Sequence, residues 1–336
     1  MIDAMIEKSK ELAETRKRTP QLLTKMQAAA KGQAPSFLIV STIRRCAQDA
    51  QLLSTQQGDA FWATRLPGPP LMRQELSPFL FGGPAAYSSH FHGRTGIVVT
   101  FESAERDSDV LDTLSTISQN GSLKGLPIVG LKVDYELGRV RLVVHNKGRN
   151  YVLENSLLQH VVRPSALDEK VLVLMCSDSR LLPPTTQTAV PMAMRTLGAF
   201  FPAFSGIEDE TSQLNTFLTQ WLEKDTTEKR IIIVAHGSTT EEPASCGAAK
   251  ASLRPSEVSD KLLRSVIERI GVDATRQNRS PAQVPEVQAM AIARAAKENL
   301  LEYPAFANLA KKKVPVADLI LLARMDTVTN NLTKVS

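Results

Sequence analysis

The segment Val171-Leu-Val-Leu-Met175-Cys176-Ser-Asp178-Ser-Arg180 carries the strongest structural signal in this chain. The residues up to Met175 are apolar without alternation, which is typical of a strand buried on both faces of a parallel sheet. The polar residues after Met175 therefore fall at the carboxyl end of that strand, the edge at which open α/β sheets bind ligands. We expect a thiol, a carboxylate and a guanidinium to lie together at this edge.

A second apolar run, Arg230-Ile-Ile-Ile-Val-Ala-His236, brings a histidine to the end of another predicted strand. Farther along, Cys246-Gly-Ala-Ala-Lys250-Ala is predicted to open a helix, whose N-terminal N–H groups favour a thiolate. Two thiolates and an imidazole are ligands that zinc takes in sites with a fourth position left for water. We predict that Cys176, His236 and Cys246 bind one zinc ion; the alternative is that both cysteines are small core residues.

These segments resemble the motifs of the beta-class carbonic anhydrases. That family carries C-S-D-S-R after one strand, an R-N-A-G turn, and H-x-x-C-G after a second strand. The corresponding residues here are Cys176-Ser-Asp178-Ser-Arg180, Arg195-Thr-Leu-Gly198, and His236 followed later by Cys246-Gly247. Residues 287–335, with a long helix, Tyr303-Pro304 and a final strand, are similar to the closing helix and strand of the family. The resemblance covers about half of the chain.

The resemblance implies zinc-dependent, reversible hydration of carbon dioxide to bicarbonate. In such a site Asp178 would accept a hydrogen bond from the reacting water, and Arg180 would keep Asp178 ionised through a charge-assisted pair. One departure from the family concerns the spacing of the ligands. The family places two residues between its histidine and second cysteine, whereas residues 237–245 intervene here. Such a loop can bulge outward at small entropic cost, or it can displace Cys246.

The first half of the chain resembles the same family more weakly, which indicates an internal repeat. Gly32-Gln33-Ala-Pro35 and the apolar run after it resemble the lead-in to the cysteine motif, and Gly58-Asp59-Ala-Phe61 resembles the family's G-D-x-F. Residues 94–101 take the place of the histidine strand, and residues 126–144 that of the closing strands.

The repeat predicts an α/β fold with two units, each a mainly parallel sheet flanked by helices, packed as an intrachain pseudo-dimer. Residues 1–150 form a degenerate copy with an N-terminal helical arm, and residues 151–336 form the zinc-binding copy. In the first copy Thr42, Arg44 and Phe101 stand where the first cysteine, the aspartate and the histidine should be. We therefore expect one zinc ion per chain.

The two copies complement each other in the residues that finish the cleft. In family dimers a glutamine and a phenylalanine from the neighbouring subunit complete each active site, and the first copy matches them with Gln33 and Phe61. The second copy has Leu167 and Pro191 at those positions. The resemblance thus implies one asymmetric site, in which Gln33 donates a hydrogen bond to substrate and Phe61 lines an apolar pocket. The alternative is that Gln33 is a loop amide and Phe61 a core aromatic residue.

The composition indicates a large globular chain. With 336 residues, 43% hydrophobic and 22% charged, it can bury two cores or one wide core. No apolar stretch approaches the length of a membrane span. The chain has three cysteines, and two of them are predicted to bind zinc, so a disulfide framework is not expected. This favours a reducing intracellular compartment, either the cytoplasm or an organelle matrix such as that of the mitochondrion. The net charge of +5 is mild, and its basic clusters are predicted to be solvated helix faces rather than nucleic-acid sites.

Several other segments carry weaker predictions. Residues 1–31 are predicted to be helical with a break at Thr19-Pro20, and they lack the apolar core of a secretory signal. Residues 146–167 are the predicted junction, with the boundary near Asn150. His90 and His92 fall in the loop-like stretch 85–94 and are expected to be surface histidines. Gly82-Gly83-Pro84 lacks the strand and helix context of a phosphate loop.

Two other functions remain open from the sequence. The chain could be a catalytically retired copy of the fold that serves as a structural subunit of a larger assembly. It could also be a related hydrolase of a small linear molecule such as carbon disulfide. As an enzyme it would take carbon dioxide or bicarbonate, and its expected assembly is a homodimer of pseudo-dimers or a larger complex.

Overall fold

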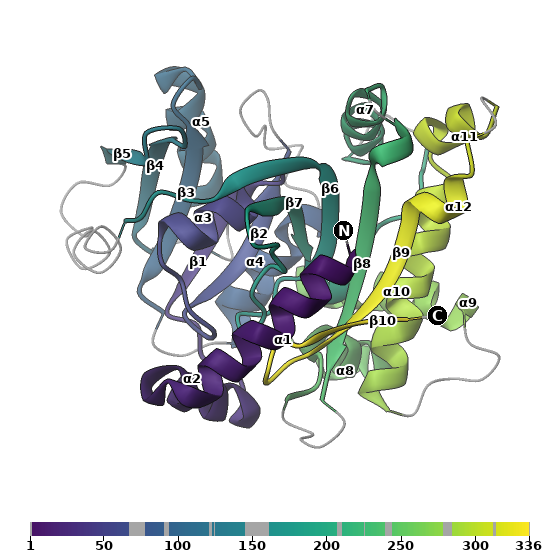
Figure 1. The fold of residues 1–336 in the computed structure, drawn as a ribbon, viewed down its shortest axis with the longest axis horizontal. Helices are drawn as coiled ribbons and strands as arrows, with labels where there is room; N and C mark the ends of the chain where they lie inside the picture. The colour runs from purple at the N-terminus through teal and green to yellow at the C-terminus, as the bar shows by residue number, and fades with distance from the viewer. Residues whose placement is uncertain are drawn as a thin grey trace.

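A computed structural model describes most of the chain. The described residues are 2–66, 78–90, 94–120, 123, 125–144, 161–206, 210–224, 226–238, 244–277, 284–311 and 314–335. They form two five-stranded sheets, with helices packed around both (Figure 1). The predicted class, α/β with two mainly parallel sheets, is confirmed.

The first sheet contains the strands of the first half of the chain. They are β1 (Phe37–Thr42), β2 (Ala60–Arg65), β3 (Gly96–Glu102), β4 (Ile128–Asp134) and β5 (Arg139–Val144). Their order is β2-β1-β3-β4-β5, and all pairs are parallel except β4 with β5. The helices that follow β1 in this half are α3 (Cys46–Leu52), α4 (Pro78–His90) and α5 (Asp107–Ser118).

The second sheet contains β6 (Ala166–Cys176), β7 (Ala189–Thr196), β8 (Arg230–Gly237), β9 (Ile320–Asp326) and β10 (Leu332–Lys334). The helices of this half are α7 (Glu210–Leu222), α8 (Gly247–Leu253), α9 (Lys261–Gln277), α10 (Pro285–Leu301), α11 (Pro304–Lys311) and α12 (Val316–Leu319). Short 3-10 turns are η4 (Leu197–Ala199), η5 (Thr226–Glu228) and η7 (Pro255–Glu257). The strand order is β10-β9-β8-β6-β7, and only β10 runs antiparallel to its neighbour.

The two sheets share one topology. When β1 to β5 are matched in chain order with β6 to β10, both sheets place the second strand at one edge, the first beside it, and the antiparallel fifth strand at the other edge. Each half of the described chain therefore builds the same sheet.

The sheets meet through their edge strands β2 and β7. The Trp62 N–H donates to the Ser177 carbonyl at 3.1 Å, and the Ala193 N–H donates to the Ile43 carbonyl at 2.9 Å. Side chains from both sheets belong to one continuous buried apolar cluster. As a result, the carboxyl end of β6 lies directly against the edge of the first sheet.

The N-terminal arm consists of α1 (Ile2–Arg18) and α2 (Pro20–Lys31), with the predicted break at Thr19-Pro20. Although α1 precedes the first sheet, it packs against the last strand of the second (Figure 1). The Ser9 hydroxyl accepts a hydrogen bond from the Leu332 N–H at 2.9 Å, and the Arg16 guanidinium donates to the Thr329 carbonyl at 3.0 Å. The arm therefore ties the two halves together.

The prediction of a loop over residues 85–94 is wrong up to His90, because α4 continues to that residue and contains Gly82-Gly83-Pro84. Local propensity marks this triplet as a helix breaker, but tertiary packing overrides it. A Cβ on Gly82 would lie 3.1 Å from Leu197 and 3.2 Å from Val266, so the glycine lets α4 pack closely on α9 and η4. His92 and the side chain of His90 lie outside the described residues.

Most of the predicted junction also lies outside the described residues, since residues 145–160 are not among them. The second sheet begins at Ala166. The boundary near Asn150 stays a prediction. Among the described helices, none is both long and apolar enough to cross a membrane.

Candidate metal centre

Three ligand residues meet at the carboxyl edge of the second sheet. Cys176 ends β6, His236 lies at the end of the adjacent parallel strand β8, and Cys246 immediately precedes α8. All three side chains are buried, and their ligand atoms lie within 4.8 Å of one another. Residues 239–243 of the long loop are outside the described part, but Cys246 beyond them is in place beside the other two. The group can hold a metal ion.

The donor atoms fit zinc. The Nε2 atom of His236 is buried and has no hydrogen-bond partner among the described residues. A buried polar atom left without a partner costs about 1 to 3 kcal/mol, and a metal bond would remove that cost. Two sulfurs and one imidazole nitrogen also match the ligand set of zinc sites that keep one position open.

The Cys246 thiol is hydrogen-bonded to the Cys176 sulfur. The hydrogen bond from the Cys246 thiol holds the pKa of Cys176 well below its usual range, against the effect of burial. The same hydrogen bond, together with burial, raises the pKa of Cys246. The Gly198 N–H also donates to the Cys176 sulfur at 3.2 Å. Because a metal needs both cysteines as thiolates, its binding would displace the proton of the Cys246 thiol.

Asp178 and Arg180 form a buried bidentate ion pair beside the ligands. The Arg180 Nε donates to Oδ1 of Asp178 at 2.9 Å and Nη2 donates to Oδ2 at 2.5 Å. Burial by itself raises the pKa of Asp178, but the charge and hydrogen bonds of Arg180 outweigh it and hold that pKa below its ordinary value. Arg180 also donates to the Ser245 carbonyl at 2.9 Å. Asp178 therefore stays ionised, with Oδ2 at 3.9 Å from the His236 Nε2.

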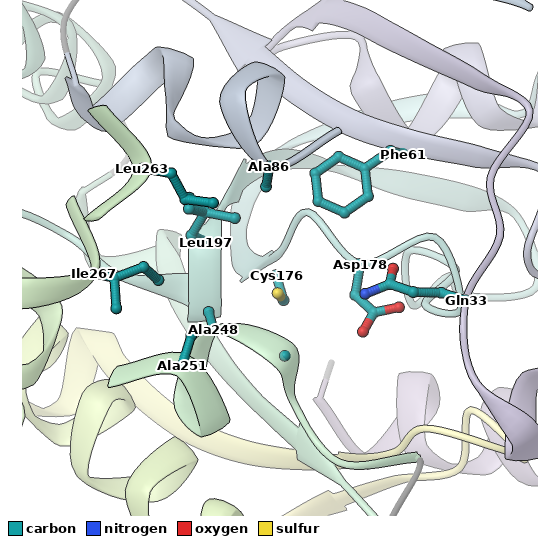
Figure 2. Close-up of a pocket in the computed structure, with 11 residues that line it drawn as sticks. Gln33, Phe61, Ala86, Cys176, Asp178, Leu197, Ala248, Ala251, Leu263 and Ile267 are labelled. Carbon is teal, nitrogen blue, oxygen red and sulfur yellow. The ribbon is translucent and has the colours of Figure 1, made fainter. Parts of the chain in front are cut away.

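A cavity of about 100 Å³ opens onto Cys176 and Asp178. Figure 2 shows Asp178, Gln33 and Phe61 at one side of it, Leu263 and Ile267 of α9 at the other, and Cys176 between them. The remaining lining residues are small or apolar: Ala86, Leu197, Gly247, Ala248 and Ala251. The cavity thus has one polar corner, at the carboxylate and the amide, and apolar walls elsewhere.

Gln33 and Phe61 reach this cavity from the first half of the chain. The Gln33 Oε1 accepts from the N–H and the hydroxyl of Ser179, both at 3.4 Å, which leaves Nε2 on the side of the cavity. A Cβ on Gly247 would lie 3.7 Å from that Nε2. Phe61 is only 3% exposed, and its ring packs 6.5 Å from the ring of Tyr87. The structure thus brings Gln33 and Phe61 to the same cavity as Cys176 and Asp178, while Arg180, His236 and Cys246 lie beyond its lining.

The corresponding place in the first sheet is built differently. Thr42 and Phe101 are buried, and the Thr42 hydroxyl has no partner among the described residues. The Arg65 guanidinium stacks 4.7 Å from the Phe101 ring and pairs with Glu105 at 2.9 Å, so this place contains an ion pair as well as apolar side chains. Arg44 points outward and pairs with an exposed glutamate. Among the described residues, Cys176, His236 and Cys246 form the one cluster of potential metal ligands.

Leu167 and Pro191, the residues of the second half that the repeat aligns with Gln33 and Phe61, do not line the cavity. Leu167 is half-buried against the apolar core, and Pro191 is buried within β7.

Two residues that contact His236 and Arg180 were not identified from the sequence. The Thr327 hydroxyl lies 3.0 Å from Nδ1 of His236, and the Asn330 amide donates to the Arg180 carbonyl at 2.9 Å. Both follow β9, whose end is level with His236 because β8 and β9 pair in parallel. The sequence offered one signal for Thr327 and Asn330: both follow the predicted final strand, β9, which pairs with the strand that ends at His236.

Searches against known proteins found likeness in solved structures alone. No family model and no curated protein matches the chain. A beta-carbonic anhydrase from Sordaria macrospora is 15% identical, with a TM-score of 0.36, over 50% of this chain and 80% of that one. The beta-carbonic anhydrase CcaA is 17% identical, with a TM-score of 0.36, over 56% and 84%. A Coccomyxa beta-carbonic anhydrase in complex with acetazolamide is 15% identical, with a TM-score of 0.36, over 49% and 71%.

Proposed function

We propose that this chain is a zinc enzyme that hydrates carbon dioxide reversibly to bicarbonate at one site. The observation that carries the proposal is the ionised Asp178, held by Arg180, which faces the same small, mostly apolar cavity as the ligand Cys176. A purely structural metal site needs neither a charged acceptor beside the ligands nor an enclosed space next to them.

The three predicted ligands and Asp178 have distinct roles in this reaction. Zinc, held by Cys176, His236 and Cys246, would supply the positive charge that makes water acidic near neutral pH. Asp178 accepts a hydrogen bond from the attacking water and so aims an oxygen lone pair at the carbon of the substrate. The reaction consumes one water and one carbon dioxide, and it releases bicarbonate and one proton.

Gln33 and Phe61 select and hold the substrate in this proposal. The Gln33 Nε2 donates to a substrate oxygen, on which negative charge grows as bicarbonate forms. Phe61 and Leu197 provide apolar walls, which suit an uncharged gas. Because Gln33 and Phe61 come from the first half, that half would complete the site, although its described residues contain no metal-ligand group.

We also propose that the chain is a tandem duplication, with residues 1–150 and 151–336 as the two copies of an intrachain pseudo-dimer. The shared strand order and strand directions of the two sheets support this proposal. The meeting of β2 with β7 supports it as well, since fusion of a dimer turns its interface into an intrachain one.

The test measures zinc content and carbon dioxide hydration on the purified chain. We expect one zinc per chain and a rate above that of buffer, both lost in Cys176→Ser. Cys46→Ser is the matched control, since Cys46 is also a fully buried thiol but lies in a separate apolar cluster. Two zinc ions per chain, or normal zinc binding by Cys176→Ser, would contradict the ligand assignment.

The same assay separates the two other candidate functions. A chain that binds zinc but gives no hydration rate would be a retired copy of the fold with a structural metal. A chain that hydrolyses carbon disulfide faster than it hydrates carbon dioxide would be the related hydrolase. We propose a reducing compartment for any of the three, because zinc binding needs the thiols in reduced form.

A further inference from the structure

We propose that the turn between β9 and β10, residues 327–330, positions the side chain of the ligand His236 and the main chain of Arg180. We also propose that Gln57, from the first half of the chain, holds this turn in place by hydrogen bonds. This proposal rests on the metal site of the proposed function and adds residues that act through the ligands. It assigns Thr327 and Gln57 as positioning residues.

The first contact is between the turn and the histidine ligand. Thr327 is fully buried, and its hydroxyl lies 3.0 Å from Nδ1 of His236. The Thr327 N–H also donates to the Gly237 carbonyl at 3.2 Å, so the turn is fastened to the residue after the ligand. An imidazole binds metal through Nε2 only when its proton sits on Nδ1, and an acceptor at Nδ1 selects that tautomer. The hydroxyl of Thr327 is in position to be this acceptor.

The second contact is between the turn and Arg180. Asn330 adopts a positive φ of 56°, a conformation that asparagine tolerates better than most residues. From there its Nδ2 donates to the Arg180 carbonyl at 2.9 Å, and its Oδ1 accepts from the Leu182 N–H at 2.6 Å. One short turn thus holds both the histidine ligand and the main chain of the arginine that pairs with Asp178.

The third contact reaches the turn from the first half of the chain. Gln57, only 3% exposed, uses its Nε2 to donate to the Thr327 carbonyl at 2.9 Å and to the Val328 carbonyl at 2.8 Å. Its neighbour Gly58 donates its N–H to the Ser179 carbonyl at 2.8 Å. Residues 57 and 58 therefore hydrogen-bond both to the turn after β9 and to the segment after Cys176. In this proposal the first half supplies these contacts in addition to Gln33 and Phe61.

The experiment measures zinc affinity by competition with a chelator for three folded variants of the turn contacts and one control variant. Thr327→Val keeps the shape of the side chain and removes the hydroxyl, and we expect zinc affinity to fall about 10- to 100-fold. Thr327→Ser restores the hydroxyl, and we expect affinity within about threefold of the wild type. Gln57→Met should lower the affinity by a smaller factor, whereas Gln56→Met, at the exposed neighbouring glutamine, should leave it unchanged.

Two spectroscopic measurements distinguish positioning from a general loss of stability. In the cobalt-substituted chain, Thr327→Val should shift the d–d bands, and Thr327→Ser should leave them as in the wild type. In the metal-free wild type, 15N NMR of His236, assigned through the loss of its signals in His236→Gln, should show the proton on Nδ1. This last measurement needs no variant of the turn to fold.

Equal zinc affinity of Thr327→Val and wild type would overturn the proposal, as would a proton on Nε2 of His236 or a wild type that binds neither metal. The proposal is independent of turnover. If the chain binds zinc with the expected sensitivity to Thr327 but shows no hydration, the proposed function fails and the positioning role stands.

Discussion

Asp178 and Arg180 depend on each other, because both charges are buried and each is the counter-charge of the other. Removal of one partner of such a pair leaves a buried charge without compensation, at a cost of about 3 to 5 kcal/mol. Since the pKa of Asp178 lies below its ordinary 3.8, the pair stabilises the fold above that pH, and this stabilisation is lost as the pH falls through the lowered pKa.

We therefore expect Arg180→Ala to lower the free energy of unfolding near neutral pH by about 3 to 5 kcal/mol, as measured by urea denaturation of the metal-free chain. The loss of stability should be smaller at acidic pH, where Asp178, no longer paired with an arginine, takes up a proton. The double variant Asp178→Ala/Arg180→Ala is the control and should recover part of the stability. A double variant less stable than the single one would contradict this account.

Gln33 offers a second prediction at the scale of one residue. Gln33→Ala should slow carbon dioxide hydration without changing zinc content, because it removes one donor to the reacting oxygen. The expected loss is about 1 to 3 kcal/mol of transition-state stabilisation, roughly a 5- to 150-fold lower rate at fixed zinc occupancy. Gln21→Ala, at an exposed glutamine of α2, is the control. A Gln33→Ala chain as fast as the wild type would remove Gln33 from the mechanism.

At the scale of one element, α3 carries a buried carboxyl that holds it to the first sheet. Asp49 is fully buried; Ser41 and Thr100 donate to its Oδ2 at 2.5 Å, and Tyr135 donates to its Oδ1 at 2.7 Å. Burial raises the pKa of Asp49 to about 6, although these hydrogen bonds and the nearby Arg45 charge act in the other direction. Compared with the unfolded chain, the fold therefore favours the protonated form of Asp49.

The sign of the resulting pH dependence is opposite to that of Asp178. Because the pKa of Asp49 rises from 3.8 to about 6 on folding, its ionisation destabilises the fold as the pH rises through that range. We expect the stability of the wild type relative to Asp49→Asn to fall by about 2 kcal/mol between about pH 4 and pH 7. Urea denaturation at a series of pH values measures the difference. A constant difference would mean that Asp49 has an ordinary pKa in the fold.

At the scale of the whole molecule, the two sheets share one continuous apolar core, and main-chain hydrogen bonds run from Trp62 of β2 to Ser177 beyond β6 and from Ala193 of β7 to Ile43 beyond β1. The arm α1 adds contacts from the start of the chain to β10. Units joined in this way expose a large apolar surface if one of them unfolds alone. The halves should therefore unfold together.

The chain has two tryptophans, one in each half, which makes this prediction testable. Trp62 lies in β2 and Trp221 in α7, and both are buried. In Trp221→Phe the fluorescence reports the first half, and in Trp62→Phe it reports the second. We expect each fluorescence transition to coincide with the circular dichroism transition of the same variant. A fluorescence change at a separate denaturant concentration would show that the halves unfold independently.

Much of the fold followed from local patterns in the sequence. The apolar runs before Cys176 and His236 predicted buried parallel strands, because a strand covered on both faces has no polar side. The helix after Cys246 and the break at Thr19-Pro20 followed from helix-terminus chemistry. The predicted strands and helices at these places are confirmed. The ligand set came from residue chemistry, since few side chains bind zinc.

Only the tertiary structure decided the features that depend on contacts between distant segments. Gly82-Gly83-Pro84 lies inside α4, where a Cβ on Gly82 would be only 3.1 Å from Leu197 of η4 and 3.2 Å from Val266 of α9. Thr327 contacts His236 from 91 residues away in the sequence, and Gln57 contacts Thr327 from 270 residues away. A sequence pattern reports the preferences of neighbouring residues, whereas such contacts arise when separate elements are packed together. The grouping of Cys176, His236 and Cys246 could therefore be predicted from the sequence, and the contacts of Thr327 and Gln57 could not.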